Sequence, residues 1–284
     1  MTTTRSEAPR TEEHAAPPEA WDAIADGYDR YVAPQEVDLA NEVLRLVGLE
    51  PGERFLDVAA GTGGLSLPAA RLAAKVLAID WSATMIERFE ARLRDEGIRD
   101  AEGRVMDCHA LELPDASFDV TGSLFGVMLV PDQQRALREM VRVTKPDGRV
   151  FVIAYGFPAE LEFLQLFVGA LKAVAPDFAG IPDDPPPLEF QVSDPDALRG
   201  RLIDAGLKDV RVERTAERPA FASGQDMWNW ILYGNPIPGV LLADFNEHER
   251  ERLREVLDGM IRERAGATGR AVLTNAVNIG VGTK

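Results

Sequence analysis

The feature that most constrains this chain is the alternation of short apolar runs with amphipathic stretches between Arg54 and Tyr155. Runs rich in valine, isoleucine and leucine, separated by helical patterns, are typical of a parallel sheet covered by helices on both faces. The expected strands are Arg54–Ala59, Lys75–Asp80, Gly103–Met106, Phe118–Leu124 and Arg149–Tyr155, and the expected helices are Gly63–Ala73, Ser82–Glu96 and Asp132–Thr144. Ser82 and Asp132 are expected to cap their helices, and Lys145–Gly148 makes a turn into the fifth strand. The pattern therefore predicts an α/β core over about residues 50–156.

The sequence on both sides of this core predicts further elements. Two amphipathic helices, within Trp21–Val32 and Val37–Val47, precede the first strand, and residues 1–18 are polar enough to form a flexible tail. After Tyr155 we expect a helix over Ala159–Val174 and an irregular proline-rich stretch, as in an insertion. The expected elements after that stretch are a helix capped by Ser193 and ending at Asp204, a strand Lys208–Thr215, an aromatic-rich segment Phe221–Tyr233, a helix Glu247–Ala265 and a last strand Arg270–Val281. We expect residues 19–284 to form a single domain.

Charge and composition exclude several classes of function. The 31 basic and 47 acidic residues give a net charge of −16, which repels phosphate backbones, so no nucleic-acid partner is expected. Cys108 is the only cysteine, and His14, His109 and His248 have no ligand spacing, so neither a disulfide nor a metal site is expected. The sequence has no apolar run long enough to span a bilayer and no apolar segment near residue 1, so we expect no membrane association and a cytoplasmic location.

A glycine-containing loop, Asp57–Gly64, follows the first expected strand and opens a helix. Glycines let a backbone approach a ligand closely, and the free N–H groups of a helix start favour an anionic or polar group. The loop taken alone fits a dinucleotide-binding fold or a simple tight turn. The dinucleotide alternative is weakened because Ser66 stands where a G-x-G-x-x-G pattern starting at Gly61 needs its third glycine.

Two further carboxylates narrow the kind of ligand that the loop is expected to bind. Asp80 ends the second expected strand, at a distance from the glycine loop that suits a carboxylate bonding both hydroxyls of a ribose. Asp107 ends the third strand. Because open parallel sheets bind ligands at the carboxyl ends of their strands, Asp57, Asp80 and Asp107 are expected to face one crevice.

These residues belong to an ordered series of motifs over roughly residues 20–215. The series consists of Trp21, Asp22, Ala25, Tyr28 and Asp29; the loop Asp57–Gly63; Asp80, Trp81, Ser82 and Met85; Asp107, Leu113, Pro114, Ser117, Phe118 and Asp119; Arg138, Glu139, Met140, Arg142, Val143, Lys145, Pro146 and Gly148; and Ala205, Gly206 and Leu207. In this series the chain resembles the class I S-adenosylmethionine-dependent methyltransferases, particularly the group that includes the quinone-biosynthesis enzymes. It departs from them at Ala59 and Asp147, where glycine is commoner.

The resemblance implies a Rossmann-like, doubly wound sheet of seven mostly parallel strands with an antiparallel last strand, preceded by N-terminal helices. It also implies S-adenosylmethionine as cofactor. Asp57 would then bond the cofactor's amino group, Asp80 its ribose, and Asp107 with the Cys108 N–H its adenine. The other expected cofactor contacts are Tyr28 at the carboxylate end, Ala59, Gly61 and Gly63 in the loop, Trp81 and Met85 beside adenine, and Leu124 and Phe125 near the sulfonium.

The acceptor of the methyl group is expected to be a small, partly apolar molecule, methylated on oxygen, nitrogen or carbon. Residues 157–192 and 216–265 would form a helical lid over it, and the aromatic residues expected to contact it are Trp21, Tyr31, Tyr155, Phe157, Phe163, Trp228 and Tyr233. No catalytic residue is assigned, because His109 should lie beside adenine and in-line displacement can depend on positioning alone.

Two other functions stay open at this point. The same fold could serve a reaction without methyl transfer, such as a cyclisation or an isomerisation, or it could be a non-catalytic binding module. A homodimer is likewise left open.

Overall fold

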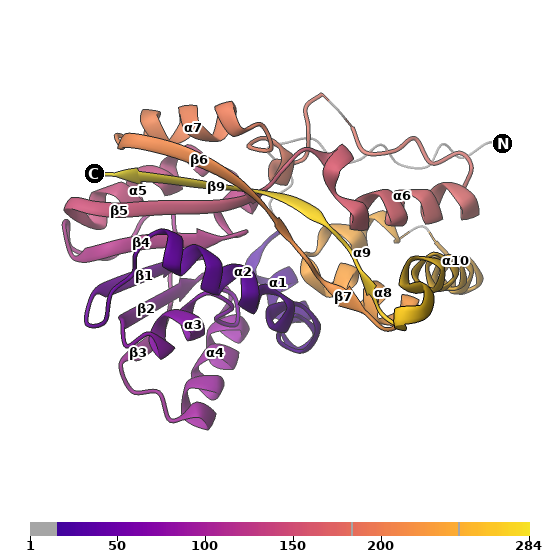
Figure 1. Cartoon of the computed structure of the whole chain (residues 1–284), viewed down its shortest axis with the longest axis horizontal. Helices are drawn as coiled ribbons and strands as arrows, with labels where there is room; N and C mark the ends of the chain where they lie inside the picture. Colours follow the sequence, from indigo (N-terminus) through magenta and orange to yellow (C-terminus); the bar gives the residue numbers. More distant parts are fainter. Residues whose placement is uncertain (1–15, 183, 244) are drawn as a thin grey trace.

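A seven-stranded sheet in the order β3-β2-β1-β4-β5-β9-β6 forms the centre of the computed structural model, which describes residues 16–284 except 183 and 244 (Figure 1). Its strands are β1 (Arg54–Val58), β2 (Lys75–Asp80), β3 (Ala101–Val105), β4 (Phe118–Leu124), β5 (Thr144–Tyr155), β6 (Lys208–Glu217) and β9 (Asn275–Thr283). Only β9 is antiparallel to both of its neighbours. The expected doubly wound, mostly parallel sheet with an antiparallel last strand is therefore confirmed.

Helices cover both faces of this sheet, because the right-handed crossovers on the two sides of β1 and β4 place their helices on opposite faces (Figure 1). One face carries α2 (Ala33–Leu46), α3 (Ser66–Arg71) and α4 (Ala83–Glu96), and the other carries α5 (Gln133–Val143) and α7 (Pro195–Asp204). The central strands are almost entirely buried, with Phe55 of β1 stacked on Phe151 of β5 at a centroid distance of 6.0 Å.

The N-terminal helices form a nearly continuous segment rather than the two separate helices expected. Helix α1 (Pro18–Gly27) passes through a π-helical turn, η1 (Tyr28–Val32), directly into α2. The expected tail at residues 1–18 lies mostly outside the described residues, and its last residue, Pro18, already begins α1.

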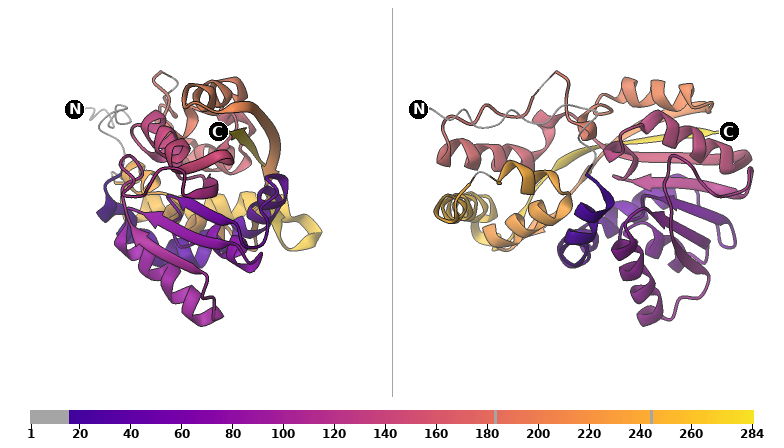
Figure 2. Two further views of the ribbon diagram at one scale, coloured as in Figure 1. Left: turned by 90° about the vertical axis from the view of Figure 1, so that its left-hand side faces the viewer. Right: turned by 180° about the vertical axis from the view of Figure 1, so that it is seen from behind.

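A second group of helices lies beyond the carboxyl ends of the parallel strands. It contains α6 (Glu162–Val174), α8 (Gly224–Gly234), α9 (Ile237–Leu241) and α10 (Glu247–Ala265), with a small sheet of β7 (Ala220–Phe221) and β8 (Ala271–Val272). The long strands β6 and β9 connect it to the central sheet, as Figure 1 and the view from behind in Figure 2 show. Its core is separate from that of the central sheet and contains Phe167, Trp228, Trp230 and Leu257. Among the described residues, no helix has the length and apolar character needed to cross a membrane.

Short 3₁₀ turns complete the chain: η2 (Val127–Leu129), η3 (Pro158–Glu160), η4 (Leu188–Phe190) and η5 (Gly266–Thr268).

Several expected elements differ in detail from the structure, and the helix expected over Gly63–Ala73 covers only Ser66–Arg71. The cap of α7 is Asp194, which accepts from the Asp196 N–H, whereas the Ser193 hydroxyl donates to the Phe190 carbonyl. The expected last strand, Arg270–Val281, is divided between β8 and β9 because its two ends pair with different sheets. The expected turn at Lys145–Gly148 lies within β5 as an irregularity in its pairing with β4. The third strand begins two residues earlier than expected and ends one residue earlier.

Candidate functional site

The residues expected to bind a cofactor come together at the carboxyl ends of neighbouring strands. Asp57 lies one residue before the end of β1, and Asp80 and Leu124 are the last residues of β2 and β4. Asp107 follows β3 by two residues, and Tyr155 ends β5. Since parallel strands end at one edge, these residues form a row along that edge of the sheet.

Asp80 fixes the glycine loop through its side chain. Its Oδ2 accepts from the Gly61 N–H at 2.9 Å, and its Oδ1 accepts from the Ser82 N–H at 2.9 Å. Burial raises the pKa of this carboxyl to about 6, against the lowering effect of these two backbone bonds. The carboxylate therefore joins the loop after β1 to the start of α4, with lone pairs left for a further donor.

Asp57 is buried and only partly satisfied. Its Oδ2 accepts from the Ser66 hydroxyl at 2.6 Å, while its Oδ1 is buried without a hydrogen-bond partner. Burial is the largest cause that raises the pKa of Asp57 to about 7, and the nearby charges of Asp80 and Glu36 contribute to the same rise. Because an unpartnered buried carboxylate oxygen is costly, this atom indicates a place for a donor such as an ammonium group. Ser66, which weakened the dinucleotide alternative, orients this carboxyl.

The glycine loop has the backbone conformation that a ligand cradle needs. Gly61 and Gly63 have φ values of +54° and +93°, and a side chain at Gly63 would overlap the ring of Phe89. Ala59 also has a positive φ, +54°, which is the left-handed conformation. This is the position at which glycine is commoner in the family that the sequence resembles. The Thr62 hydroxyl is a second buried polar atom without a partner in this loop.

Tyr28 lies over the loop from the N-terminal segment. A Cβ built on Gly61 would lie 3.5 Å from its ring, and its hydroxyl donates to Glu36 Oε1 at 2.8 Å. Burial, followed by the charge of Glu36, raises the pKa of Tyr28 well above its usual range. The ring therefore covers the loop as a neutral phenol.

Two aspartates of the N-terminal motif attach α1 and η1 to α4. Asp22 Oδ1 accepts from the Ser82 hydroxyl at 2.6 Å and from the Thr84 N–H at 3.0 Å. Asp29 pairs with Arg92 at 3.1 Å. The sequence motif contained both aspartates, but it gave no sign that their partners lie on the helix after β2. Trp21, expected near the acceptor, is partly exposed on α1.

The loop after β3 holds Asp107, Cys108 and His109. Asp107 is more than half exposed, and its Oδ1 accepts from the His109 N–H at 2.9 Å and lies 2.7 Å from His109 Nδ1. Burial acts to raise the pKa of Asp107, but these His109 contacts outweigh it and the pKa is lowered. Burial raises the pKa of the Cys108 thiol to about 12, so the group is a protonated thiol at neutral pH and a poor metal ligand. His109 thus orients Asp107.

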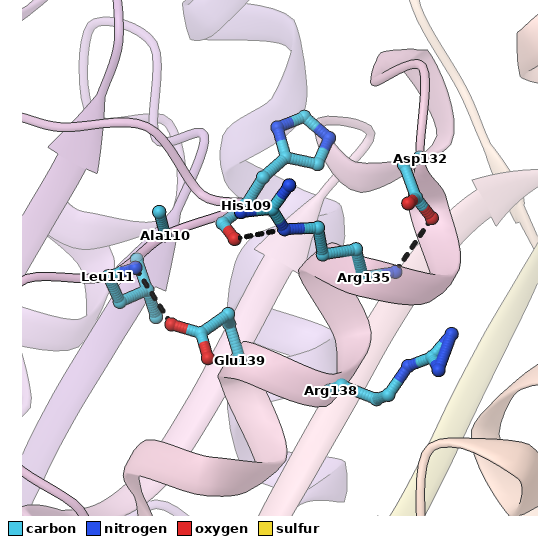
Figure 3. A pocket seen from close by; sticks show the side chains of 7 residues that line it. All are labelled: His109, Ala110, Leu111, Asp132, Arg135, Arg138 and Glu139. Carbon is cyan, nitrogen blue, oxygen red and sulfur yellow. Dashed lines mark hydrogen bonds between the residues drawn. The ribbon is translucent and has the colours of Figure 1, made fainter.

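A pocket of about 680 Å³ adjoins this loop, and Figure 3 shows the side chains that line it. Its polar groups are largely occupied by one another. Arg135 Nε donates to the His109 carbonyl at 2.7 Å, Asp132 caps the Arg135 N–H at 2.9 Å, and Glu139 accepts from the Leu111 N–H at 2.8 Å (Figure 3). These bonds attach the loop after β3 to α5. A second pocket of about 340 Å³ includes Arg54 and Lys75, which begin β1 and β2, so it lies at the opposite edge of the sheet.

The apolar residues expected beside the cofactor occupy the same edge as the carboxylates. Met85 is buried in the first turn of α4, and Trp81 is partly exposed between β2 and α4. Leu124 and Phe125 are buried at the end of β4, where Phe125 has a φ of +55°. A left-handed phenylalanine is a strained conformation of the kind that concentrates at functional sites.

A row of aromatic rings runs from the end of β4 into the second group of helices. In order, this ring row consists of Phe125, Tyr155, Phe163, Trp230 and Phe221, with successive centroid distances of 4.5, 5.5, 5.1 and 5.7 Å. Two residues expected to contact the acceptor, Tyr155 and Phe163, are therefore in van der Waals reach of the strand ends. The indole Nε1 of Trp230 is buried without a hydrogen-bond partner.

The other expected acceptor residues lie elsewhere. Tyr31 stacks on Tyr233 of α8 at 5.7 Å, which joins the N-terminal segment to the second group of helices. Trp228 is buried between α8 and α10 with the Arg254 guanidinium 5.7 Å from its ring centroid. Phe157 lies between β5 and η3 and is 40% exposed. The ring row includes none of these four residues.

Three buried glutamates lie beside this row, and sequence reasoning missed all of them. We call them the carboxyl cluster: Glu36 of α2, Glu189 of η4 and Glu217 of β6. Burial is the largest cause that raises their pKa values, to about 7, 7 and 8 respectively. Glu217 Oε2 accepts from Asn275 Nδ2 at 3.2 Å and from the Tyr155 hydroxyl at 3.5 Å, whereas Glu189 Oε2 has no partner.

Comparison with known protein families connects this geometry to a family. A family model for a methyltransferase domain matches residues 56–152, which include the glycine loop and the ends of β1, β2 and β4. A demethylmenaquinone methyltransferase of Renibacterium salmoninarum is 33% identical over 209 residues, which cover 66% of this chain and 85% of that protein.

Two further comparisons show a shorter match and a match with lower sequence identity. An uncharacterised protein of Mycobacterium tuberculosis is 41% identical over 108 residues, and the match spans only 38% of this chain and 39% of that protein. The crystal structure of Haemonchus contortus phosphoethanolamine N-methyltransferase 2, in complex with phosphomonomethylethanolamine and S-adenosylhomocysteine, is 18% identical. It covers 87% of this chain and 52% of that chain with a TM-score of 0.54, a similarity of fold.

Proposed function

This chain belongs to the class I S-adenosylmethionine-dependent methyltransferases, and we propose that it transfers a methyl group from S-adenosylmethionine to oxygen, nitrogen or carbon of a small, partly apolar acceptor. The observation that carries this proposal is the buried, unpartnered Oδ1 of Asp57 beside the glycine loop. S-Adenosylmethionine presents an ammonium group, which would satisfy that oxygen.

The described residues fit the rest of the cofactor as well. Asp80 would hold the ribose hydroxyls with the lone pairs not used by Gly61 and Ser82. Asp107 and the Cys108 N–H would bond adenine, and the ring of Tyr28 would cover the methionine end and exclude water. When bound, the cofactor supplies a methyl group activated by a positively charged sulfur.

For the acceptor, we propose a position between the end of β4 and the second group of helices. Phe125 and Tyr155 lie at the strand ends, and Phe163 of α6 contacts Tyr155, so α6 and α8 would act as the lid. The chain's contribution to rate is then positioning and desolvation rather than a dedicated base. Residues 157–192 and 216–265 are the segments that we propose for this lid.

Two measurements test the function. Titration calorimetry is expected to detect binding of S-adenosylmethionine and of S-adenosylhomocysteine, and a labelled methyl group is expected to appear on a product in a screen of small acceptors. Absence of cofactor binding would contradict the proposal altogether. Cofactor binding without any label transfer across amines, phenols, thiols and activated carbons would favour a binding module or another reaction.

Replacing Phe163 with alanine is expected to lower kcat/KM for the acceptor by about ten- to a hundred-fold, because an aromatic contact contributes on the order of 1.5 to 3 kcal/mol. The Kd for S-adenosylmethionine should stay within about threefold, since the cofactor is held by the sheet edge. Steady-state kinetics and calorimetry on one preparation separate the two effects.

Trp228→Ala serves as the matched comparison for that variant. Because Trp228 is buried between α8 and α10, its loss should lower the free energy of unfolding by about 3 to 5 kcal/mol. A parallel loss of cofactor and acceptor binding in Phe163→Ala would instead make Phe163 a packing residue like Trp228.

A further inference from the structure

One member of the carboxyl cluster, Glu217, accepts from the Tyr155 hydroxyl at 3.5 Å, and the charges of the other two also act on that hydroxyl. Burial raises the pKa of Tyr155 well above its usual range, and the charges of Glu217, Glu36 and Glu189 all raise it further. These glutamates come from β6, α2 and η4, so the fold brings together carboxyls that are far apart in the sequence. Their convergence on the last residue of β5 places them at the proposed acceptor position.

The carboxyl cluster has too few cations nearby to balance the negative charge of three ionised carboxylates. Among the residues that the structure describes, Arg92 is the one cation whose charge lowers the pKa of Glu36. In the part of the chain that the structure describes, Glu217 bonds only to the neutral groups of Asn275 and Tyr155, and Glu189 pairs with no lysine or arginine. Buried carboxylates are normally paired or protonated, so the site is suited to a ligand that brings positive charge.

A single metal ion does not fit this geometry. Among the described histidine, cysteine, aspartate and glutamate side chains, only Asp107, Cys108 and His109 form a group of three with ligand atoms within 4.8 Å of one another. The three glutamate carboxyls are therefore too widely spaced to coordinate one ion together. A larger organic cation can contact several of them.

The ring row supplies a second, independent reason for a ligand of this kind. Tyr155, Phe163 and Trp230 form consecutive contacts beside the carboxyls, and the faces of aromatic rings attract organic cations. Trp230 is 4% exposed, and its Nε1–H is buried with no acceptor, so it is an unused donor in the same row. A ligand oxygen would satisfy it.

We propose that the carboxyl cluster and the ring row recognise an acceptor that carries a protonated amine or another organic cation together with an apolar body. The inference rests on the proposed methyltransferase function, because it takes the acceptor to lie beside Phe125 and Tyr155. Charge-assisted bonds to carboxylates and contact with ring faces select the cation over a neutral molecule of equal shape. The chain's net charge of −16 also attracts cations from solution.

Binding of three matched probes tests this inference without turnover. The full chain is saturated with S-adenosylhomocysteine, and titration calorimetry then measures Kd for tyramine, 4-ethylphenol and 3-(4-hydroxyphenyl)propanoate at neutral pH. The cationic amine is expected to bind at least tenfold tighter than the neutral phenol, and the anion weakest of the three. Equal affinity for the cation and the neutral phenol, or no binding of any probe to the loaded protein, overturns the inference.

Glu217→Gln identifies the cluster as the source of the preference. The ratio of the two Kd values, neutral over cationic, should fall by about tenfold, and Glu213→Gln, an exposed change on the same strand, should leave the ratio unchanged. If Glu217→Gln does not fold, Glu189→Gln is the variant to measure, since its Oε2 accepts no bond. An unchanged ratio in the folded cluster variant overturns the assignment. Failure of S-adenosylhomocysteine to bind at all would instead contradict the proposed function.

Discussion

Replacing Asp80 with alanine is expected to weaken S-adenosylmethionine binding by about a hundred-fold. In the free protein this carboxylate accepts from the Gly61 and Ser82 N–H groups, so its removal leaves the glycine loop and the start of α4 without their common acceptor. The proposed bonds to the ribose hydroxyls are lost at the same time. Removing a charged hydrogen-bond partner costs about 1.5 to 3 kcal/mol, and about 2.7 kcal/mol corresponds to a factor of a hundred in Kd.

Titration calorimetry measures this effect, and Asp100→Ala is the control. Asp100 is an exposed aspartate at the opposite edge of the sheet, just before β3, so its loss should leave Kd unchanged. A folded Asp80→Ala protein whose Kd lies within threefold of the original would remove Asp80 from the cofactor site.

The second large effect concerns pH. Without ligands, the protein should become less stable as pH rises from about 5.5 to 8.5. Burial raises the pKa of the site carboxyls in the folded state, to about 6 for Asp80, about 7 for Asp57, Glu36 and Glu189, and about 8 for Glu217. In the unfolded chain these groups titrate near their ordinary values of about 4.

The direction of this change in stability follows from the number of protons that the folded and unfolded states bind. Between pH 5.5 and 8.5 the folded state binds protons that the unfolded state has already released, so stability falls as these carboxyls ionise. A loss of about 3 kcal/mol would lower Tm by about 5 °C for a chain of 284 residues. Thermal denaturation across this range, with salt held constant, measures the slope. A Tm that stays level or rises toward pH 8.5 would contradict the buried, unbalanced state of these carboxyls.

The same measurement in the presence of S-adenosylmethionine should give a shallower slope. The cofactor's ammonium group would stabilise the ionised form of Asp57, which reduces the difference in bound protons between folded and unfolded states. Because the pKa of Asp57 is about 7, cofactor affinity should rise as pH increases toward 7 and then level off.

Much of the fold could be predicted from the sequence where local patterns decide the structure. The strands Lys75–Asp80 and Phe118–Leu124 and the helix Glu247–Ala265 have the expected bounds. Elsewhere the pattern could not identify pairing partners. The stretch 271–277 contains no glycine or proline, so nothing local indicates that β8 and β9 separate there.

The candidate site likewise contains residues that local sequence predicts and residues that it does not predict. Asp57 and Asp80 lie at the ends of strands and belong to a motif, so their positions could be predicted. Glu36, in the first turn of a helix, has the sequence context of a surface residue, and its burial depends on the contact with Tyr28 and on the close approach of Gly64. Glu189 and Glu217 are likewise buried by segments distant in sequence. The local sequence pattern does not indicate which distant segments will cover a residue.

The N-terminal segment from Pro18 to Leu46 borders both proposed ligand positions. Tyr28 lies on the glycine loop, and Tyr31, one turn later, stacks on Tyr233 of the second group of helices. If cofactor binding shifts this segment, the acceptor side shifts with it, and thermodynamic linkage then requires each ligand to change the other's affinity by the same factor. Dissociation constants measured for either ligand alone would then not describe the ternary complex.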